Sequence, residues 1–286
     1  MKPVKKVVIP VAGMGTRILP ATKAVPKEML TVVDKPLIDY AVSEAIEAGI
    51  EQIIFITGKG KSAIINYFDV NTKLENVLTK SNKMDLLAKV KKSNLKEGQA
   101  VYVRQSVPLG LGHAISLAKG IIGDEPFAVI LPDDLIMGKN PLKELIEVYE
   151  KTGGNVIAVN EVDKAIVNRY GVLDIAEAKN NVYKAKSMVE KPKVEEAPSN
   201  LAVVGRYVLN PLIFNYMDTE VKEGKEIQLT DAISRCIEKI DLYGVKFSGK
   251  RYDCGNKLGL VEAIIEVALQ TDDIKSDVLN IIKRHV

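Results

Sequence analysis

The first half of the chain alternates short apolar runs with longer segments in which apolar residues recur at helical spacing. The apolar runs are typical of buried strands, and they cover Lys6–Val11, Gln52–Thr57, Gln99–Arg104 and Pro126–Leu131. The pattern between them predicts helices over Leu37–Ala48, Lys61–Phe68, one or two within 72–94, His113–Ala118 and Pro141–Glu150. Strands that alternate with helices predict a mostly parallel sheet with helices on both of its faces.

The second half has a different pattern. Val172–Ile175 and Val182–Val189 alternate apolar and polar residues on either side of Asn180–Asn181, which predicts a β-hairpin. Another strand is expected over Leu201–Val208. Helical spacing follows over Pro211–Met217, Leu229–Ile240, Asn256–Leu269 and Lys275–Lys283.

No internal repeat and no low-complexity linker separates the two halves. We therefore expect one α/β domain over residues 1–286, with its halves meeting at about residue 160. The predicted architecture is a Rossmann-like mixed, mostly parallel sheet flanked by helices, with a small β-rich extension. Ligands of such sheets bind beyond the carboxyl ends of the strands, so the loops at those ends are the candidate site.

Composition and charge narrow the possible partners. The 40 basic and 37 acidic side chains give a net charge of +3, too balanced to indicate nucleic acid or a membrane surface. No apolar run approaches the roughly 18 residues of a membrane helix, and the strand-like start does not read as a signal peptide. Cys236 and Cys254 lack the paired spacing of a disulfide framework or zinc site. We therefore expect a cytoplasmic protein.

The segment after the first strand, VAGMGTRILPATKAVPKE (residues 11–28), carries the first candidate chemistry. Gly13 and Gly15 suit a dinucleotide-binding turn, but Ile18 replaces the third glycine of that fingerprint and two prolines prevent a regular helix. The glycines either permit a tight turn only or help to form a phosphate-binding nest of free backbone N–H groups. The second interpretation is favoured because no acid precedes Glu28 and the loop supplies Thr16, Arg17, Lys23 and Lys27.

The segment GKGKS, from Gly58 to Ser62, is a weaker candidate. It resembles the end of a P-loop, but Phe55 stands where the first glycine of that motif is required. Lys59 and Lys61 are therefore expected to be solvated side chains at the start of a helix. The histidines form no grouping with a nucleophile and an acid, and His113, at a helix start, is expected to be structural.

Acidic residues follow two of the predicted strands. Asp133 and Asp134 come directly after a buried strand in LPDDL, a position suited to a hard cation such as Mg²⁺ or to solvated turn acids. Asp253 in YDCGN is either a second metal ligand or an acid at a helix entry. Glu190 and Lys191 in VEKP suit a sugar hydroxyl and a phosphate, or form a salt bridge at a strand end.

Seven segments together resemble the bacterial UTP–glucose-1-phosphate uridylyltransferases (UDP-glucose pyrophosphorylases) of the sugar nucleotidyltransferase family. In chain order they are GMGTRILPATKAVPKEML, RQSVPLGLGHA, LPDDL, YGV, VEKP, EIQLTDAI and YDCGNKLG. The resemblance covers nearly the whole chain, although the broader family shares only the G-x-G-T-R…P-K part. It implies the nucleotide-diphospho-sugar transferase fold and the Mg²⁺-dependent conversion of UTP and α-D-glucose 1-phosphate to UDP-glucose and pyrophosphate. It also suggests a homodimer or homotetramer.

The resemblance further assigns individual residues. It implies that uracil is held by Ala12, Gly13, Glu28, Gln105 and Gly110, and the triphosphate by Gly15, Thr16, Arg17 and Lys27. Glucose 1-phosphate would be held by Gly171, Glu190 and Lys191, with Asp134 assisting. Asp133 would bind Mg²⁺, with Asp253 as second ligand. The catalytic groups would be Arg17, Lys27, Asp133 and Lys191, with the nucleotide bound by residues 1–160 and the sugar phosphate by residues 161–286, which also hold the C-terminal helices.

Two alternatives remain open. One is a related thymidylyl-, cytidylyl- or adenylyltransferase acting on another sugar phosphate; Glu28 and the LPDD motif favour uridylyl transfer over it. The other is a non-catalytic homologue that binds sugar nucleotides and regulates a partner enzyme. Such a protein is expected to have lost a phosphate-handling residue, and this chain retains all of the expected ones.

Overall fold

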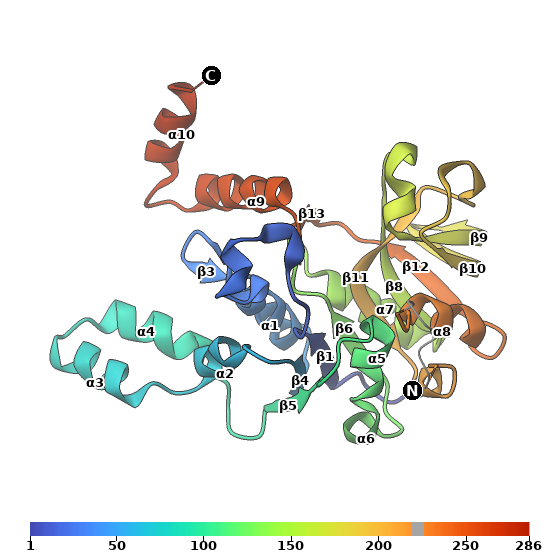
Figure 1. The fold of residues 1–286 in the computed structure, drawn as a ribbon, viewed down its shortest axis with the longest axis horizontal. Helices are drawn as coiled ribbons and strands as arrows, with labels where there is room; N and C mark the ends of the chain where they lie inside the picture. Colours follow the sequence, from blue (N-terminus) through green and yellow to red (C-terminus); the bar gives the residue numbers. More distant parts are fainter. Residues whose placement is uncertain (219–225, 286) are drawn as a thin grey trace.

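The fold is built on one mixed sheet, seen in a computed structural model that describes residues 1–218 and 226–285 (Figure 1). Within these residues the sheet has nine strands in the order β5-β4-β1-β6-β11-β8-β12-β10-β9. The first four are parallel, namely β5 (Ala100–Arg104), β4 (Gln52–Thr57), β1 (Lys6–Pro10) and β6 (Phe127–Ile130). Their carboxyl ends therefore meet at one edge of the sheet.

The other five strands come from the second half of the chain. They are β8 (Asn155–Glu161), β9 (Gly171–Lys179), β10 (Val182–Glu190), β11 (Leu201–Leu209) and β12 (Leu242–Lys246). Of their pairings, only β12 with β8 is parallel. The mixed sheet is as expected, with its parallel pairs concentrated in the first half. Because β6 pairs with β11, both halves of the chain share one sheet.

The predicted hairpin is confirmed as β9 and β10. Its two turn residues, Asn180 and Asn181, both adopt left-handed backbone conformations, with φ of 51° and 63°. Two consecutive positive φ angles are what a two-residue hairpin turn requires, and asparagine tolerates them better than most residues.

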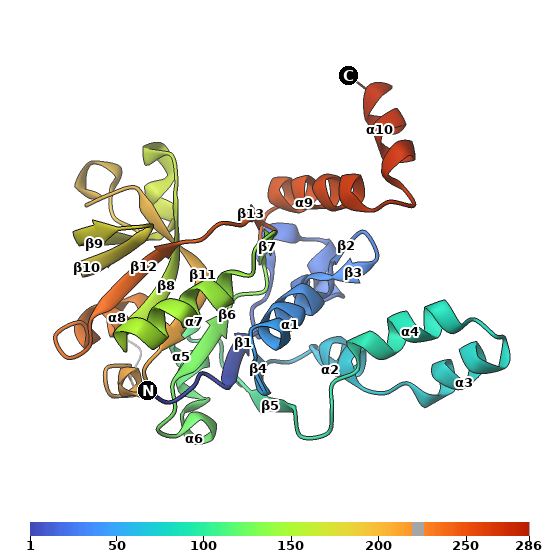
Figure 2. The ribbon, with the colours of Figure 1, turned by 180° about the vertical axis from the view of Figure 1, so that it is seen from behind.

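Helices cover both faces of the sheet (Figures 1 and 2). One face is covered by α1 (Leu37–Glu47), α2 (Ser62–Phe68) and α7 (Pro141–Thr152). The other is covered by α5 (Leu111–Ser116), α6 (Lys119–Ile122) and α8 (Leu229–Cys236). Neighbouring strand residues alternate between the two cores: Val7 and Ile9 pack on the α1 side, and Val8 packs on the α5 side.

Two helical arms project from the body on the same side (Figure 1). One is the hairpin of α3 (Thr72–Lys80) and α4 (Met84–Ser93), and the other consists of α9 (Lys257–Gln270) and α10 (Lys275–Lys283). No helix in the described part of the chain is long and apolar enough to cross a membrane.

Several short elements differ from the expected pattern. The segment expected as a helix from Pro211 is a 3₁₀-helix, η6 (Pro211–Asn215), and η4 (Lys164–Arg169) and η5 (Val194–Glu196) are also 3₁₀ turns. The strands that periodicity did not indicate are β8, β12, β2 (Thr31–Val32), β3 (Lys35–Pro36), β7 (Asp134–Met137) and β13 (Lys250–Asp253). The last two pair as a separate ribbon that matters for the site.

Candidate active site

The loop after β1 contains no regular helix, as its prolines predicted. It folds into three short 3₁₀ turns: η1 (Thr16–Ile18), η2 (Ala21–Lys23) and η3 (Lys27–Met29). Gly15 has a φ of 68°, and a Cβ on it would lie only 3.1 Å from the Thr22 side chain and 3.2 Å from Lys27 Cβ. The Thr22 hydroxyl donates to the Gly15 carbonyl at 2.7 Å, which folds the loop back on itself. Glycine is therefore needed here for both backbone conformation and close approach.

An ion pair ties this loop to the end of β6. Lys27 Nζ lies 2.5 Å from Asp133 Oδ2. Burial acts to raise the pKa of Asp133, but the Lys27 ammonium outweighs it, and the pKa of this carboxyl lies below its usual value. Burial likewise acts to lower the pKa of Lys27, but the carboxylates of Asp133 and Glu28 reverse the effect. Both partners are therefore charged at neutral pH.

Asp253 reaches the same place through the ribbon of β7 and β13. The ribbon pairs Asp253 with Asp134, and the Cys254 amide donates to the Asp133 carbonyl at 2.8 Å. A Cβ added to Gly255 would lie 2.9 Å from Asp133 Oδ2, 3.0 Å from Asp253 Oδ1 and 3.2 Å from Arg17 Nη2. Two carboxylates and a guanidinium thus converge on a space that exists because residue 255 has no side chain.

The donor set at this space suits a hard cation. Both candidate ligands are carboxylate oxygens, which Mg²⁺ prefers. Among the described residues, no group of three or more His, Cys, Asp or Glu side chains could hold a metal. The residues that the structure describes would therefore offer such a cation two carboxylates, those of Asp133 and Asp253.

Asp134 has different partners from its neighbour. Its Oδ1 accepts from Arg251 Nε at 2.6 Å and lies 2.5 Å from Arg251 Nη2, while its Oδ2 accepts from the Gly205 amide at 3.1 Å. Burial raises the pKa of Asp134, and Arg251 does not fully offset it. The Arg251 guanidinium lies 5.3 Å from the centre of the Tyr170 ring. Both Asp134 oxygens already accept hydrogen bonds from the protein, so this carboxylate acts first as part of the framework.

Glu190 and Lys191 lie at the end of β10 with Gly171 opposite. Glu190 Oε1 lies 3.2 Å from Lys191 Nζ, and its Oε2 accepts from the Thr230 hydroxyl at 2.7 Å. A Cβ on Gly171 would come within 3.2 Å of the same Oε2. Lys191 has a φ of 46°, which is rare for lysine, and its amide donates to the Tyr170 carbonyl at 2.9 Å. Backbone conformations of this kind concentrate at functional sites.

One cleft of about 400 Å³ joins these groups. Of the predicted site residues, it is lined by Arg17, Asp133, Asp134, Gly171, Glu190, Lys191 and Asp253. Two larger surface hollows, of about 610 and 460 Å³, lie elsewhere and contain none of the predicted residues, all of which belong to the described part of the chain. Chemistry rather than volume therefore identifies the site.

The predicted uracil residues lie where β1, β4 and β5 end side by side. A Cβ on Gly58, after β4, would lie 3.3 Å from the Ala12 carbonyl, and the Gln105 amide donates to the Thr57 carbonyl at 2.7 Å. Gln105 Nε2 lies 2.8 Å from His113 Nδ1, so His113 contacts a predicted binding residue.

Comparison with known proteins now bears on this geometry. The profile of the family described as nucleotidyl transferase matches residues 6–270. The chain belongs to this family. It is 51% identical over 285 residues to a UTP–glucose-1-phosphate uridylyltransferase of Staphylococcus haemolyticus, covering 99% of each chain.

This nucleotidyl transferase also resembles solved structures along its whole length. A UDP-glucose pyrophosphorylase from Acinetobacter baumannii superposes with a TM-score of 0.91 at 42% identity, covering 99% of this chain and 100% of the other. The UTP-bound form of the enzyme from that organism superposes with a TM-score of 0.89 at 42% identity, covering 98% of each chain.

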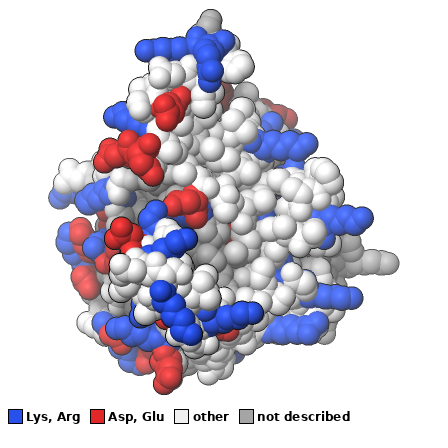
Figure 3. Space-filling model, turned by 90° about the vertical axis from the view of Figure 1, so that its left-hand side faces the viewer, with Lys and Arg blue, Asp and Glu red and all other residues white. Residues whose placement is uncertain are grey.

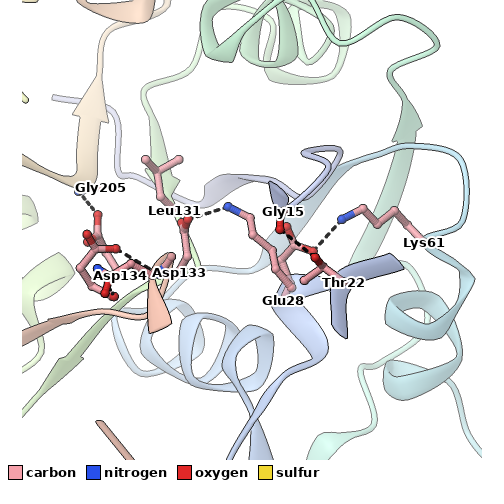
Figure 4. A network of polar contacts seen from close by, with 12 residues as sticks. Gly15, Thr22, Glu28, Lys61, Leu131, Asp133, Asp134 and Gly205 are labelled. Carbon is pink, nitrogen blue, oxygen red and sulfur yellow. Dashed lines mark hydrogen bonds and ion pairs between the residues drawn. The ribbon is translucent and has the colours of Figure 1, made fainter. Parts of the chain in front are cut away.

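The surroundings of one lysine and one glutamate, Lys61 and Glu28, differ from those expected from the sequence (Figure 4). Lys61 is not solvated: it is 7% exposed, and its Nζ lies 2.8 Å from Glu28 Oε2. Glu28 is fully buried, and its Oε1 has no hydrogen-bond partner in the described structure. Because no surface of this carboxylate is open, a direct contact with uracil would require the Glu28 side chain to move.

Sequence reasoning missed three residues that shape the site: Lys61, Thr230 and Arg251. Lys61 lies in the segment GKGKS, which lacks the first glycine of a P-loop, so its side chain was expected to be solvated. Thr230 lies inside EIQLTDAI, which supported the resemblance but received no role. Arg251 comes two residues before Asp253, in a strand of four residues whose pattern does not indicate its role.

Proposed function

We propose that this chain transfers the uridylyl group of UTP to α-D-glucose 1-phosphate, giving UDP-glucose and pyrophosphate. The observation that carries the proposal is the convergence of Asp133, Asp253 and Arg17 beside Gly255, in one cleft with Glu190 and Lys191. Two carboxylates with nearby cations suit a metal-bound triphosphate, and a lysine–glutamate pair suits a sugar phosphate. The names of these relatives support UTP and glucose 1-phosphate as the specific substrates.

In this reaction the protein mainly has to align the two substrates and stabilise their negative charge. The phosphate oxygen of glucose 1-phosphate is already anionic at neutral pH, so no side chain has to remove a proton from it. This oxygen forms a bond to the α-phosphorus of UTP, and the bond between the α-phosphorus and the bridging oxygen to the β-phosphorus breaks, which releases pyrophosphate. Aligning two polyanions in a fixed electrostatic environment is an effective way to lower such a barrier.

Each end of the cleft has its own task. Gly15, Thr16, Arg17 and Lys27 hold the triphosphate, and the two cationic side chains also stabilise charge on the departing pyrophosphate. Gly171, Glu190 and Lys191 hold glucose 1-phosphate, Lys191 binding its phosphate. Ala12, Gly13, Gln105 and Gly110 form the uracil subsite, with Glu28 acting from behind it.

Mg²⁺ would be held by Asp133 and Asp253, the two carboxylates that border the space at Gly255. When bound, it would supply positive charge that neutralises the phosphates. In its absence, the repulsion between Asp133, Asp253 and a triphosphate opposes UTP binding, which Arg17 and Lys27 only partly offset.

A pyrophosphate-release assay tests the proposal. Purified protein is supplied with UTP, CTP, ATP or dTTP, each with glucose 1-phosphate or another hexose 1-phosphate, with Mg²⁺ or with EDTA. We expect the highest kcat/KM for UTP with glucose 1-phosphate, and loss of activity with EDTA. Preference for another nucleotide would identify a related transferase, and tight UDP-glucose binding without pyrophosphate release would identify a non-catalytic homologue.

We also propose that two copies of the chain pair through the α9–α10 arm. Leu258, Val261 and Ile265 lie at helical spacing on α9 and are 77%, 51% and 41% exposed. Figure 3 shows the side from which the arms project: basic side chains lie mostly around its rim, and a broad area carries few charges. A helix face this apolar is usually covered by a partner.

Light scattering of variants tests this pairing. Val261→Glu places a charge within the apolar stripe and is expected to yield monomers at concentrations where the natural protein is a dimer or tetramer. Gln270→Glu places the same charge on an exposed position of the same helix and serves as the control. If the natural protein is monomeric, or if both variants keep its mass, the arm does not pair subunits.

A further inference from the structure

Glu28, at the end of the triphosphate loop, forms a buried ion pair with Lys61, and Lys61 has no role in the chemistry described so far. Lys61 stands directly before α2, and Glu28 belongs to η3. Their side chains are 8% and 0% exposed, with 2.8 Å between Lys61 Nζ and Glu28 Oε2. Figure 4 shows Glu28 lying between Lys61 on one side and Asp133 on the other. A charged pair removed this far from water is stable only while both partners are present.

The charges around this pair alternate in sign. Lys61 faces Glu28, Glu28 directly follows Lys27 in the chain, and Lys27 faces Asp133. The Glu28 carboxylate acts on Lys27 as well as on Lys61, since its charge contributes to the raised pKa of Lys27. Burial raises the pKa of Glu28, and Lys61 is the strongest influence against it, followed by Lys27. The same carboxylate is therefore shared between a lysine behind the site and a lysine within it.

One oxygen of Glu28 could attract a further hydrogen-bond donor. Oε1 is buried and has no hydrogen-bond partner in the described structure. A buried acceptor in that state gains strongly from any donor that reaches it. Besides Lys61, the cation whose charge acts on Glu28 is Lys27, whose ammonium must instead remain at Asp133 and the triphosphate.

We propose that Lys61 is a positioning residue that neutralises Glu28 and thereby keeps the Lys27 ammonium directed into the active site. This inference rests on the proposed function, because it assumes that Lys27 binds the triphosphate. Without Lys61, the Glu28 carboxylate attracts Lys27 away from Asp133. This weakens the triphosphate subsite and leaves the sugar-phosphate subsite, at Glu190 and Lys191, unchanged.

The experiment compares Lys61→Met with a matched control, Lys59→Met, which removes an exposed lysine two residues earlier. Initial rates of pyrophosphate release are measured against UTP and against glucose 1-phosphate, and binding of inorganic pyrophosphate with Mg²⁺ is measured by calorimetry. We expect Lys61→Met to raise the KM for UTP and to weaken pyrophosphate binding by about tenfold or more, as for other residues that orient a binding group. The KM for glucose 1-phosphate and the Lys59→Met variant should remain near the natural values.

A double variant separates this role from a purely structural one. In Lys61→Met/Glu28→Gln no buried carboxylate competes for Lys27, so the double variant should bind UTP as well as Glu28→Gln alone. Lys61→Arg, which keeps the charge, should retain most of the natural affinity. The inference is overturned if Lys61→Met leaves the KM for UTP unchanged, or if Lys61→Met raises this KM by the same factor when Glu28→Gln is also present. Failure of the natural protein to release pyrophosphate from UTP would instead overturn the proposed function.

Discussion

The two ends of the cleft are built differently. At the nucleotide end the ion pairs are largely withdrawn from water: the side chains of Lys27 and Asp133 are 19% and 17% exposed, and those of Lys61 and Glu28 are 8% and 0% exposed. At the sugar end, Lys191 is 55% exposed and Glu190 is 22% exposed. Charges fixed in a dry environment stabilise a transition state without reorganising, whereas an open lysine can adjust to an arriving substrate. Substitution of Asp133 at the first end should therefore lower kcat, and substitution of Lys191 at the second should act mainly through substrate affinity.

Removing Asp133 is expected to have the largest effect. Asp133→Ala deletes a proposed metal ligand and the partner of Lys27, so we expect turnover to fall by at least about 100-fold. The rate of pyrophosphate release at saturating concentrations of both substrates measures this turnover, and circular dichroism checks that the variant is folded. The control is Asp124→Ala, which removes an exposed aspartate that comes before β6, whereas Asp133 comes after it. Near-normal turnover of Asp133→Ala would show that Asp133 has no part in the mechanism.

Loss of Lys191 should be next in size. Lys191→Ala removes the proposed phosphate contact at the open end, and we expect kcat/KM for glucose 1-phosphate to fall by about 100-fold. The KM for UTP should change little, since the nucleotide end is intact. Lys193→Ala, which removes an exposed lysine from the same segment, is the comparison; equal effects of the two variants would contradict a specific role for Lys191.

A smaller effect is expected from Thr230. Thr230→Val keeps the shape of the side chain but removes the hydroxyl that donates to Glu190, so Glu190 should orient the sugar less well. We expect the KM for glucose 1-phosphate to rise by about tenfold, a typical loss for one hydrogen bond to a charged group. Thr230→Ser restores the donor and should restore the KM; if it does not, the methyl group rather than the hydrogen bond is what matters.

The pair of Lys27 and Asp133 should also contribute to stability in a pH-dependent manner. The pKa of Asp133 is lower in the folded protein than its usual value of 3.8, so the stabilisation is present above that value and is lost as the pH falls through the lower folded pKa. In Lys27→Met, burial of Asp133 acts without opposition from Lys27. We therefore expect Lys27→Met to lower the Tm by a few degrees at pH 7 and by less at pH 3. A difference in Tm that does not shrink in acid would contradict this.

Local signals in the sequence predicted the elements that depend on neighbouring residues. The prolines of residues 11–28 excluded a helix there, and Asn180 and Asn181 marked the hairpin turn. The four parallel strands also followed from their apolar runs. In each case the residues that decide the structure lie close together in the chain.

The residues that were missed depend on partners far along the chain. Lys61 meets Glu28 across 33 positions, and Arg251 meets Asp134 across 117. The ribbon of β7 and β13 has strands of four residues each, too short for a clear period of two. Lys61 looked solvated because sequence spacing does not reveal that a buried acid lies opposite. The spacing of residues along the chain does not show which charged side chains will meet in the folded protein.

The pairing of β6 with β11 has a consequence for motion. Residues 127–130 of the first half of the chain and 206–209 of the second half are hydrogen-bonded neighbours in the middle of the sheet. A hinge that swung the two halves apart would have to break this ladder, so we expect substrate binding to move only small parts, such as the loop of residues 11–28. Hydrogen exchange should accordingly find the β6 and β11 amides slow with and without UTP, and changes on binding confined to the loops around the cleft.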